Sequence, residues 1–542
     1  MRALFFFLFT VAVSIVSDTV AQEVAVAKEA YGSDDYIKGV EAYRSGDFRG
    51  AVKFWKSAAK SGNANAQCNL GSCYAKGEGV EQDYSKALDC YKKAAKQGND
   101  VAECNIGNFY FNACGVEQDF DEAVEWYVKA AEKGNVNAIA SLGVCYKLGV
   151  GISVDEEKAF DCFYRSAEAG NTMAQNELAE CYYFGVAVDQ DMEEAAYWYS
   201  QSAKNGNADA QYNLAVCYAA GEGVEPDSTE AIKWLLESAE NGNVKAQCDI
   251  ARCYSDGAGV VQDKSEAAKW YKKAAEQGDI DAQYILAGCY YSGDGVFRDK
   301  EEAFRWYKSA AGSGDAMAQC QLASCYYYGE GIRADIDKAM MWYRKAAAQG
   351  NVEAMFCLAE EYYWGEYVSL DMEKAKELYI ASAEGGYAPA YNSLGYFYMN
   401  GIMFQPDLEK ALESYKAAAD MGDVEGLYNL GVCYFKGIGT EPDFVEAVRC
   451  YIKAANRGNV DAMYNLGVCY YHGIGIPVSY MKAAKWYKEA AMAGNSSAQY
   501  ELGLCYYNGD GVTANLDEAK KWFQYAAEQG ETNAIEILKK IK

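Results

Sequence analysis

Small and apolar residues recur at a fixed spacing along most of the chain. In the stretch that begins at Ala66, Leu70 and Tyr74 follow four and eight residues later, which places all three on one face of a helix. The same pattern returns every 36 residues, without insertion or deletion, through thirteen units. The units begin at Ala66, Ala102, Ala138, Ala174, Ala210, Ala246, Ala282, Ala318, Ala354, Ala390, Gly426, Ala462 and Ala498. The pattern predicts a tandem array over 66–533, in place of the separate globular domains that 542 residues would otherwise suggest.

Each unit contains the signals for two helices and the turn between them. Positions are counted from the first residue of each unit, which is position 0. Gly-Glu-Gly at 77–79 suits the positive φ of a tight turn, and position 11 is Gly in twelve of the thirteen units. Asp83, at position 17, is the N-cap expected for a second helix, and Gly98, at position 32, is the C-terminal glycine in every unit. We therefore expect a helix A, a turn and a helix B in each unit.

Tyrosine follows the same period. It occupies position 8 in all thirteen units and position 25 in ten, and we predict that both sets lie in the core. Burying one such ring contributes about 2 kcal/mol, whereas ordering each of 36 residues costs about 1 kcal/mol or more. A single unit should therefore not be stable alone, and the sequence predicts an all-α solenoid in which neighbouring units cover each other.

The two ends of the array differ from the repeating unit. Residues 34–65 contain a helix pair with a shortened loop, which we interpret as an N-terminal cap. A lone helix near 534–542, with Lys539 and Lys540 in its last turn, is expected to cap the other end. Residues 22–33 carry no regular pattern and are predicted to be unstructured.

The first 21 residues are predicted to be a secretory signal peptide. Arg2 precedes an apolar run over 3–16, and Thr19-Val20-Ala21 forms a small-residue cleavage site. The run is shorter than the roughly 20 residues that span a bilayer, so we expect no membrane insertion after cleavage. The protein is then exported to a periplasm, to the medium or to the lumen of an endomembrane compartment.

The charge balance narrows the classes of partner. With 50 basic and 78 acidic side chains, the formal net charge is −28, which opposes binding to nucleic acid or to anionic membranes. We expect a protein or peptide as the partner, and a glycan as a second class.

The sequence offers little for catalysis. His472 is the sole histidine, so a nucleophile paired with a histidine base has a single candidate. Glu180, Glu360 and Glu361 have no evident partners for acid–base work. The cysteines lack the close spacing of zinc ligands. We predict a protein that is not an enzyme and has no cofactor or metal.

Nineteen cysteines in an exported protein suggest disulfides, although an odd count leaves at least one of them unpaired within the chain. Ten of the nineteen occupy position 7 of helix A, as buried apolar side chains would. Three units could form a bridge between their two helices, with the pairs Cys73 and Cys90, Cys145 and Cys162, and Cys433 and Cys450. Packing alone is the alternative interpretation.

The consensus A-x-x-x-L-G-x-x-Y-x-x-G-x-G-V-x-x-D-x-x-K/E-A-x-x-W-Y-x-x-A-A-x-x-G, which the unit 246–278 illustrates, resembles the Sel-one-like repeat family, relatives of the tetratricopeptide repeats. The resemblance covers about nine-tenths of the chain. It implies a right-handed α/α superhelix whose A helices line a concave groove, as in adaptors of secretion, quality control and host interaction.

A cysteine-rich bacterial branch of that family is sometimes labelled as β-lactamases. In that branch a disulfide ties the end of helix B to the next helix A. The corresponding residues here are Ala95 and Ala102, so neither the bridge nor the enzymatic label carries over.

Aromatic residues at positions 2, 9 and 10 of helix A suggest a binding groove. If the array is a solenoid, these positions point away from the core towards its concave side, where rigid aromatic rings anchor ligands and amides pair with a peptide backbone. The alternative is that the rings pack between adjacent helices and only reinforce the stack. The candidates are Tyr284, Tyr291, Tyr327, Tyr328, Phe356, Tyr363, Trp364, Tyr428, Asn429, Phe435, Tyr464, Asn465, Tyr471, Tyr500 and Tyr507.

Two successive loops, at 365–368 and 401–404, lack the second glycine. Ile402, Met403 and Phe404 could form a second contact site or could fold inward. Taken together, the sequence predicts an exported, non-enzymatic scaffold that binds an extended peptide or protein in an aromatic-lined concave groove. The alternatives are an envelope enzyme of the β-lactamase-labelled branch and a passive structural spacer.

Overall fold

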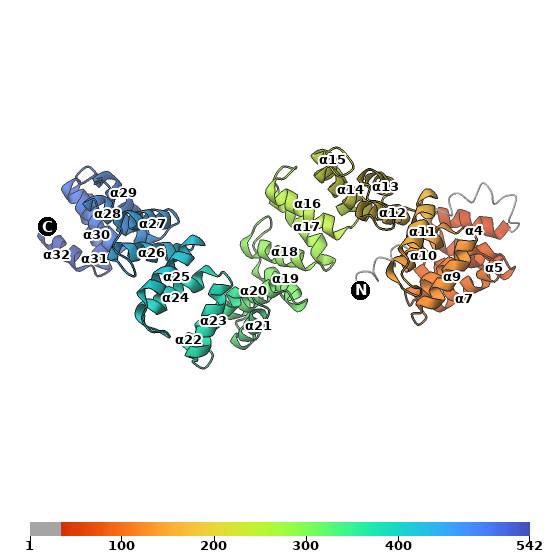
Figure 1. Cartoon of the computed structure of the whole chain (residues 1–542), viewed down its shortest axis with the longest axis horizontal. Helices are drawn as coiled ribbons and strands as arrows, with labels where there is room; N and C mark the ends of the chain where they lie inside the picture. Colours follow the sequence, from red (N-terminus) through yellow and green to blue (C-terminus); the bar gives the residue numbers. More distant parts are fainter. Residues whose placement is uncertain (1–33, 542) are drawn as a thin grey trace. The chain divides into compact units, whose positions relative to one another are not determined.

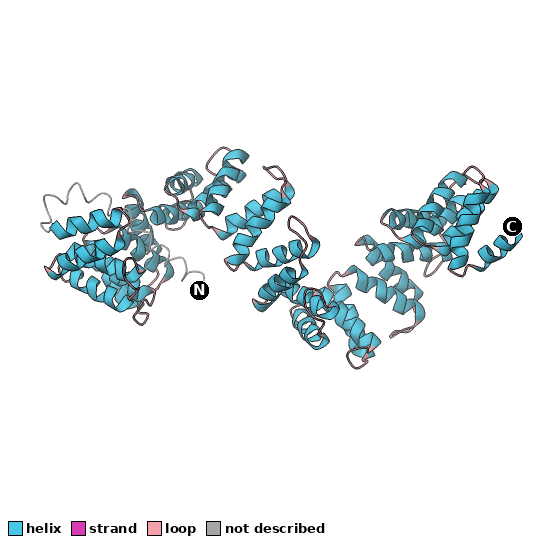
Figure 2. Cartoon of the chain, turned by 180° about the vertical axis from the view of Figure 1, so that it is seen from behind, coloured by secondary structure: helices cyan, strands magenta, loops and turns pink. Residues whose placement is uncertain are grey.

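A computed structural model describes residues 34–541, and within that range it contains 29 helices and no strand (Figures 1 and 2). The prediction of an all-α array of paired helices is confirmed. The predicted signal peptide, the segment 22–33 and Lys542 lie outside the described residues. Among the residues described, no helix is long and apolar enough to cross a bilayer.

Even-numbered labels belong to A helices and odd-numbered labels to B helices, starting with the N-terminal pair. The A helices are α4 (Asp34–Arg44), α6 (Ala64–Lys76), α8 (Asp100–Phe111), α10 (Val136–Leu148), α12 (Thr172–Phe184), α14 (Ala208–Ala220), α16 (Val244–Asp256), α18 (Ile280–Ser292), α20 (Ala316–Tyr328), α22 (Val352–Trp364), α24 (Ala388–Asn400), α26 (Val424–Lys436), α28 (Val460–His472), α30 (Ser496–Asn508) and α32 (Thr532–Lys540). The B helices are α5 (Phe48–Lys60), α7 (Tyr84–Ala95), α9 (Phe120–Glu132), α11 (Glu156–Glu168), α13 (Met192–Lys204), α15 (Ser228–Glu240), α17 (Lys264–Glu276), α19 (Lys300–Gly312), α21 (Ile336–Ala348), α23 (Met372–Glu384), α25 (Leu408–Asp420), α27 (Phe444–Asn456), α29 (Tyr480–Met492) and α31 (Leu516–Glu528).

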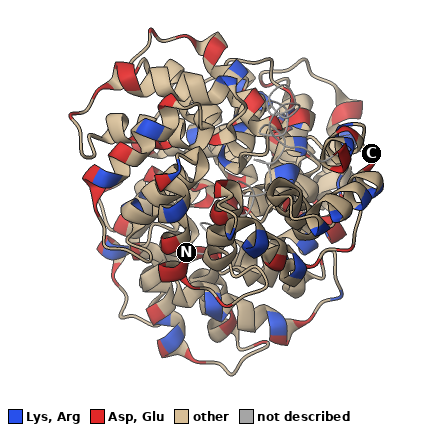
Figure 3. Cartoon of the chain, turned by 90° about the vertical axis from the view of Figure 1, so that its right-hand side faces the viewer, with Lys and Arg blue, Asp and Glu red and all other residues tan. Residues whose placement is uncertain are grey.

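The helices form two compact units, one up to Gln277 and one from Gly278 onward. Within each unit, a helix packs chiefly on the helices before and after it in the chain. Acidic residues recur along the helices and loops, with Lys and Arg among them (Figure 3).

The caps of the B helices follow the prediction. The carboxylate of Asp83 accepts a hydrogen bond from the backbone N–H of Lys86 at 2.9 Å, as an N-cap does. The A helices have a cap of their own that the sequence analysis missed. The side chain of Asn63 accepts from the N–H of Ala66 at 2.7 Å, and an Asn or Asp plays this role at the start of most A helices. The amide of such a cap can also bond to the preceding repeat, as Asn99 does to Asn65 at 2.8 Å.

Buried glutamine side chains tie each of several A helices to two B helices. The amide of Gln319 on α20 donates to the carbonyl of Ala311, at the end of α19, at 3.3 Å. Its oxygen accepts from the amide of Gln349, at the end of α21, at 2.8 Å. Similar donor contacts to the preceding helix are made by Gln67, Gln175, Gln211, Gln247 and Gln499. The polar junction therefore fixes how one repeat is placed against the next.

The two tyrosine sets differ in burial, which corrects part of the prediction. The position-25 rings are buried, as Tyr91 and Tyr379 show. Most position-8 rings are only half-buried, because they lie at the edge where helix A meets the turn. Several of them are covered by a lysine three residues after the helix B cap; the ammonium of Lys158, for example, lies 5.4 Å from the centre of the Tyr146 ring.

No disulfide joins the cysteines of residues 34–541, and most of these side chains are buried between helices. The structure contains no bridge between the three pairs predicted above. Burial raises the pKa of Cys73 and Cys145 to about 12 and that of Cys433 to about 11. Since the thiolate is the reactive form, these side chains are chemically quiet at neutral pH.

A first prediction concerns the turn glycine at position 13. A Cβ on Gly331 would lie 1.9 Å from the carbonyl oxygen of Lys300, whereas a Cβ on Gly350 would meet nothing within 4 Å, and both residues have positive φ. We expect Gly350→Ala to cost about 1 kcal/mol, from the left-handed backbone alone. Gly331→Ala should cost at least about 2 kcal/mol more, because backbone must move. Urea unfolding of both variants measures the difference, and equal losses would contradict the close approach.

A second prediction concerns the one repeat in which the buried glutamine is replaced by an acid. Glu103 is buried and pairs with Lys133 at 2.6 Å, in the geometry of Gln319 with Gln349. Lys133→Gln should lower the unfolding free energy by about 2 kcal/mol, since it leaves a buried carboxylate without a cation. The double variant Glu103→Gln/Lys133→Gln recreates the amide pair and should recover most of the loss. A double variant no more stable than the single one would show that the two sites are not equivalent.

A third prediction concerns the thiols. At pH 8 the raised pKa values leave Cys73, Cys145 and Cys433 almost fully protonated, so iodoacetamide should label them far more slowly in the folded chain than in guanidinium. Without a reductant, the unfolded chain should take up nineteen labels, counted by mass spectrometry. If the three predicted bridges were present, six labels would be missing.

Candidate functional site

The structure divides the predicted groove residues into three groups according to their position in helix A. The first group, at position 2, comprises Tyr284, Phe356, Tyr428, Tyr464 and Tyr500. Each of these rings is half-buried and packs against the position-25 ring on helix B of its own repeat. Their centroid distances are 5.8 Å for Tyr284 with Tyr307, 5.8 Å for Phe356 with Tyr379, 6.2 Å for Tyr428 with Tyr451, 6.1 Å for Tyr464 with Tyr487 and 5.7 Å for Tyr500 with Phe523. These rings therefore connect the two helices of a repeat.

The two predicted amides take part in hydrogen bonds between repeats. The side chain of Asn429 on α26 donates to that of Asn392 on α24 at 2.9 Å. Asn465 on α28 hydrogen-bonds to Tyr428 on α26, while burial, as the larger effect, raises the pKa of that tyrosine. A peptide backbone that used these amides would have to displace the bonds between repeats.

Four of the six residues in the second group, at position 9, contact the following repeat. The hydroxyl of Tyr471 donates to Asp510 at 2.9 Å, and burial together with this bond raises its pKa to about 12. Tyr291 bonds to Glu330 in the equivalent way, and Tyr327 donates to Glu361 at 2.6 Å. The ring centroid of Tyr363 lies 5.2 Å from that of Phe397, and the ring centroid of Phe435 lies 5.4 Å from that of Phe444. The last member, Tyr507, is 45% exposed.

The third group, at position 10, points into solvent. Tyr328 is 70% exposed at the end of α20, and Trp364 is 67% exposed at the end of α22. The indole N–H of Trp364 donates to Glu360 at 3.0 Å, which orients the ring without burying it. Of the aromatic candidates, these two are the most accessible, and they occupy the same place in consecutive repeats.

Acidic side chains for which the sequence suggested no partner all acquire one. Glu180 accepts from Lys147 at 2.9 Å, and the same lysine contacts Glu177 at 2.6 Å. Glu360 accepts from Tyr379 at 2.5 Å in addition to Trp364. The contacts of Lys147 with Glu180 and of Tyr379 with Glu360 join different helices, so they were not visible in the repeat pattern.

The second of the two unusual loops folds inward. Ile402, Met403 and Phe404 are half-buried against the core of the second unit, and the Phe404 ring lies 4.3 Å from that of Tyr398. Met403 replaces the usual glycine and keeps its left-handed backbone, with φ at 61°. Of the two interpretations left open by the sequence, the structure supports the inward one.

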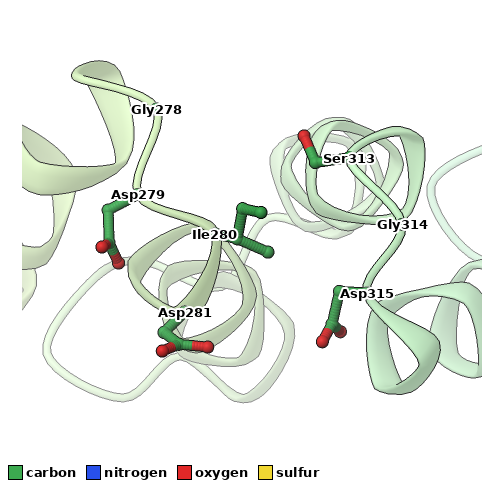
Figure 4. A pocket seen from close by; sticks show the side chains of 7 residues that line it. All are labelled: Gly278, Asp279, Ile280, Asp281, Ser313, Gly314 and Asp315. Carbon is green, nitrogen blue, oxygen red and sulfur yellow. The ribbon is translucent and has the colours of Figure 1, made fainter. Parts of the chain in front are cut away.

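A shallow, open depression of about 570 Å³ lies at the turns that start α18 and α20 (Figure 4). It contains three aspartates, Asp279, Asp281 and Asp315, and none of the predicted aromatic residues. Asp279 and Asp315 already accept hydrogen bonds from the first turns of α18 and α20, at 2.8 and 2.6 Å. Among the residues that the structure describes, no three His, Cys, Asp or Glu side chains are placed to hold a metal ion. The lining residues are Gly278, Asp279, Ile280, Asp281, Ser313, Gly314 and Asp315.

Comparison with solved structures places the chain beside other repeat proteins. A protective antigen present in uropathogenic Escherichia coli strains, described as having an SLR fold, is 30% identical over 91% of this chain and 97% of its own, with a TM-score of 0.47. A Sel1 repeat protein from Oxalobacter formigenes is 30% identical over 57% of this chain and 91% of its own, with a TM-score of 0.43. An immunity protein from Pseudomonas aeruginosa is 22% identical over 42% and 81%, with a TM-score of 0.27. No curated protein matches the sequence.

The family model described as Sel1 repeat matches fourteen consecutive segments, and the first of them covers the pair α4 and α5. The matched residues are 31–63, 64–99, 100–135, 136–171, 172–207, 208–243, 244–279, 280–315, 316–351, 352–387, 388–423, 424–459, 460–495 and 496–531. These segments contain the helix pairs and turn glycines described above. The chain therefore belongs to the Sel1 repeat family, whose tetratricopeptide-like solenoids are typical protein-interaction scaffolds.

Proposed function

We propose that this chain is an exported, non-enzymatic scaffold that binds an extended peptide or protein segment on the A-helix side of its second unit. The observation that carries the proposal is the exposure of Tyr328 and Trp364 at the same position of consecutive repeats. Large aromatic rings are costly to leave in water, and clusters of them anchor most protein interfaces.

The other members of the same position support this choice. In the repeats that follow, position 10 carries Asn400, Lys436, His472 and Asn508, which are polar, as an exposed helix end requires. The stack therefore does not need an aromatic residue there. The position-2 rings and the amides are already engaged inside the stack, which leaves the helix ends as the accessible part of the predicted groove.

Export is part of the proposal and rests on the sequence alone. The apolar run over 3–16 and the cleavage site at 19–21 support secretion. Because acidic side chains outnumber basic ones, a partner other than nucleic acid is favoured. A glycan stays a second class of ligand, because stacked aromatic rings also suit sugars.

A double variant tests the proposal. The mature chain and Tyr328→Ala/Trp364→Ala would each be immobilised, partners captured from native extract would be identified by mass spectrometry, and the purified partner would be titrated by calorimetry. We expect affinity to fall at least about ten-fold, a loss of about 1.4 kcal/mol or more. Because both rings are exposed, the unfolding free energy should change by less than about 0.5 kcal/mol.

The matched control removes two other exposed rings, with Tyr197→Ala on α13 and Tyr525→Ala on α31, which are 53% and 42% exposed on B helices. It should bind like the parent chain. Equal capture by all three proteins would move the interface elsewhere, and no specific capture would favour the passive spacer.

A further inference from the structure

One region of the second unit departs from the repeat pattern in several ways at once. It lies where α20, α22 and the loop after α22 meet (Figure 1). We call it the aromatic–acidic patch, and it consists of Tyr327, Tyr328, Glu360, Glu361, Trp364, Glu366 and Tyr367.

The loop that supplies Tyr367 has its own backbone conformation. At position 13, the other twelve repeats have positive φ, and ten of them use glycine there. At Gly331 the backbone passes so close to the preceding helix B that a Cβ would overlap the carbonyl oxygen of Lys300, although Ala187 and Met403 carry a side chain at the same position with positive φ. Tyr367 does not adopt the left-handed conformation. Its ring is 49% exposed and stands perpendicular to that of Tyr327, with 5.8 Å between centroids.

A carboxylate lies behind these rings in a place where other repeats have an apolar group. Glu361 occupies position 7, which is Cys in ten repeats and Phe in two. It is 6% exposed, and although one oxygen accepts from Tyr327 at 2.6 Å, the other, Oε2, has no hydrogen-bond partner. Among the described residues it forms no ion pair. Burying a carboxylate in this way costs stability, and such local departures concentrate at functional sites.

Two further carboxylates complete the patch. Glu360 accepts from both Tyr379 and the exposed indole of Trp364, and exposed Glu366 hydrogen-bonds to Tyr367. Lys300, at the start of α19, is paired with Glu330 at 2.6 Å. The aromatic rings are thus accompanied by three acids, each hydrogen-bonded to a tyrosine or tryptophan of the cluster around α22.

We propose that the aromatic–acidic patch binds a lysine or arginine side chain of the partner polypeptide. Cations are attracted to the faces of Trp and Tyr rings, and the carboxylates beside and behind the rings add to that negative potential. The net charge of −28 favours the same class of ligand. An uncharged apolar segment would gain binding free energy from contact with the rings, but it would gain no electrostatic attraction from Glu360, Glu361 and Glu366. The inference rests on the proposed function, which places a polypeptide on this side of the second unit.

Synthetic peptides of defined charge test the proposal. The probes are fluorescein-labelled peptides of four Gly-Ser-Lys units, the same peptide with acetylated lysines, and the same peptide with glutamate in place of lysine. Binding is followed by fluorescence anisotropy at about 0.15 M salt, where long-range attraction to a charged surface is largely screened. We expect the lysine peptide to bind at least ten-fold more tightly than the acetylated one, and the glutamate peptide not to bind.

Matched variants locate the interaction. Glu360→Gln/Glu361→Gln should weaken binding of the lysine peptide at least ten-fold, as should Trp364→Ala. The control Glu156→Gln/Glu157→Gln also removes two negative charges, but from exposed residues of α11, and it should change the affinity less than two-fold. Glu366→Gln offers an exposed substitution that leaves the buried contacts in place, and it should weaken binding measurably without a change in melting.

The outcomes separate this proposal from the scaffold proposal. If the acetylated peptide binds as tightly as the lysine peptide, or if no peptide binds, cation recognition is overturned. An equal effect of the control pair would mean that general charge, and not the patch, attracts the peptide, and would also overturn it. Capture of a partner that depends on Tyr328 and Trp364 but not on Glu360, Glu361 and Glu366 would leave the scaffold proposal intact while rejecting this one.

Discussion

Polar contacts at the junction between repeats fix the stacking wherever helix A begins with a buried glutamine. A buried glutamine such as Gln319 bonds to the end of the preceding helix B and receives a bond from Gln349 at the end of the following one. Apolar contacts are tolerant of small shifts, whereas an amide buried without its partner costs free energy. In the repeats that contain them, these bonds therefore restrict how far one repeat can shift against the next.

The same junction explains where variation is allowed. Positions that meet a neighbouring repeat are restricted, as the close approach of Gly331 to Lys300 shows, whereas positions at the end of helix A touch little. The aromatic rings of Tyr328 and Trp364 occupy these free positions. A surface for binding can therefore be built on the array without disturbing the contacts that hold it together.

The residues around α22 depart from the repeat pattern at two positions that most other repeats keep. A core cysteine position holds Glu361, and a turn glycine position holds Tyr367. Both changes lie within seven residues and affect side chains that contact Tyr327. The clustering of costly departures in one repeat, amid neighbours that keep the pattern, is the main structural argument for a specific binding site there.

The sequence by itself determined the all-α repeat array, because the 36-residue period of Ala66, Leu70 and Tyr74 and the turn signals such as Gly98 are local and additive. It also predicted the Asp83 cap, which depends on three neighbouring residues. The N-cap role of Asn63 could have been found from the same kind of local signal.

Only the tertiary structure decided which aromatic residues are accessible. Tyr428, at position 2, and Trp364, at position 10, were both predicted to line the groove, yet one packs against Tyr451 and the other lies in solvent. The partners of Glu361 and Gln319 likewise come from other helices some 30 residues away. Burial and pairing of this kind depend on how adjacent repeats are placed. That placement arises only when helices of different repeats stack, so the sequence of a single repeat does not contain it.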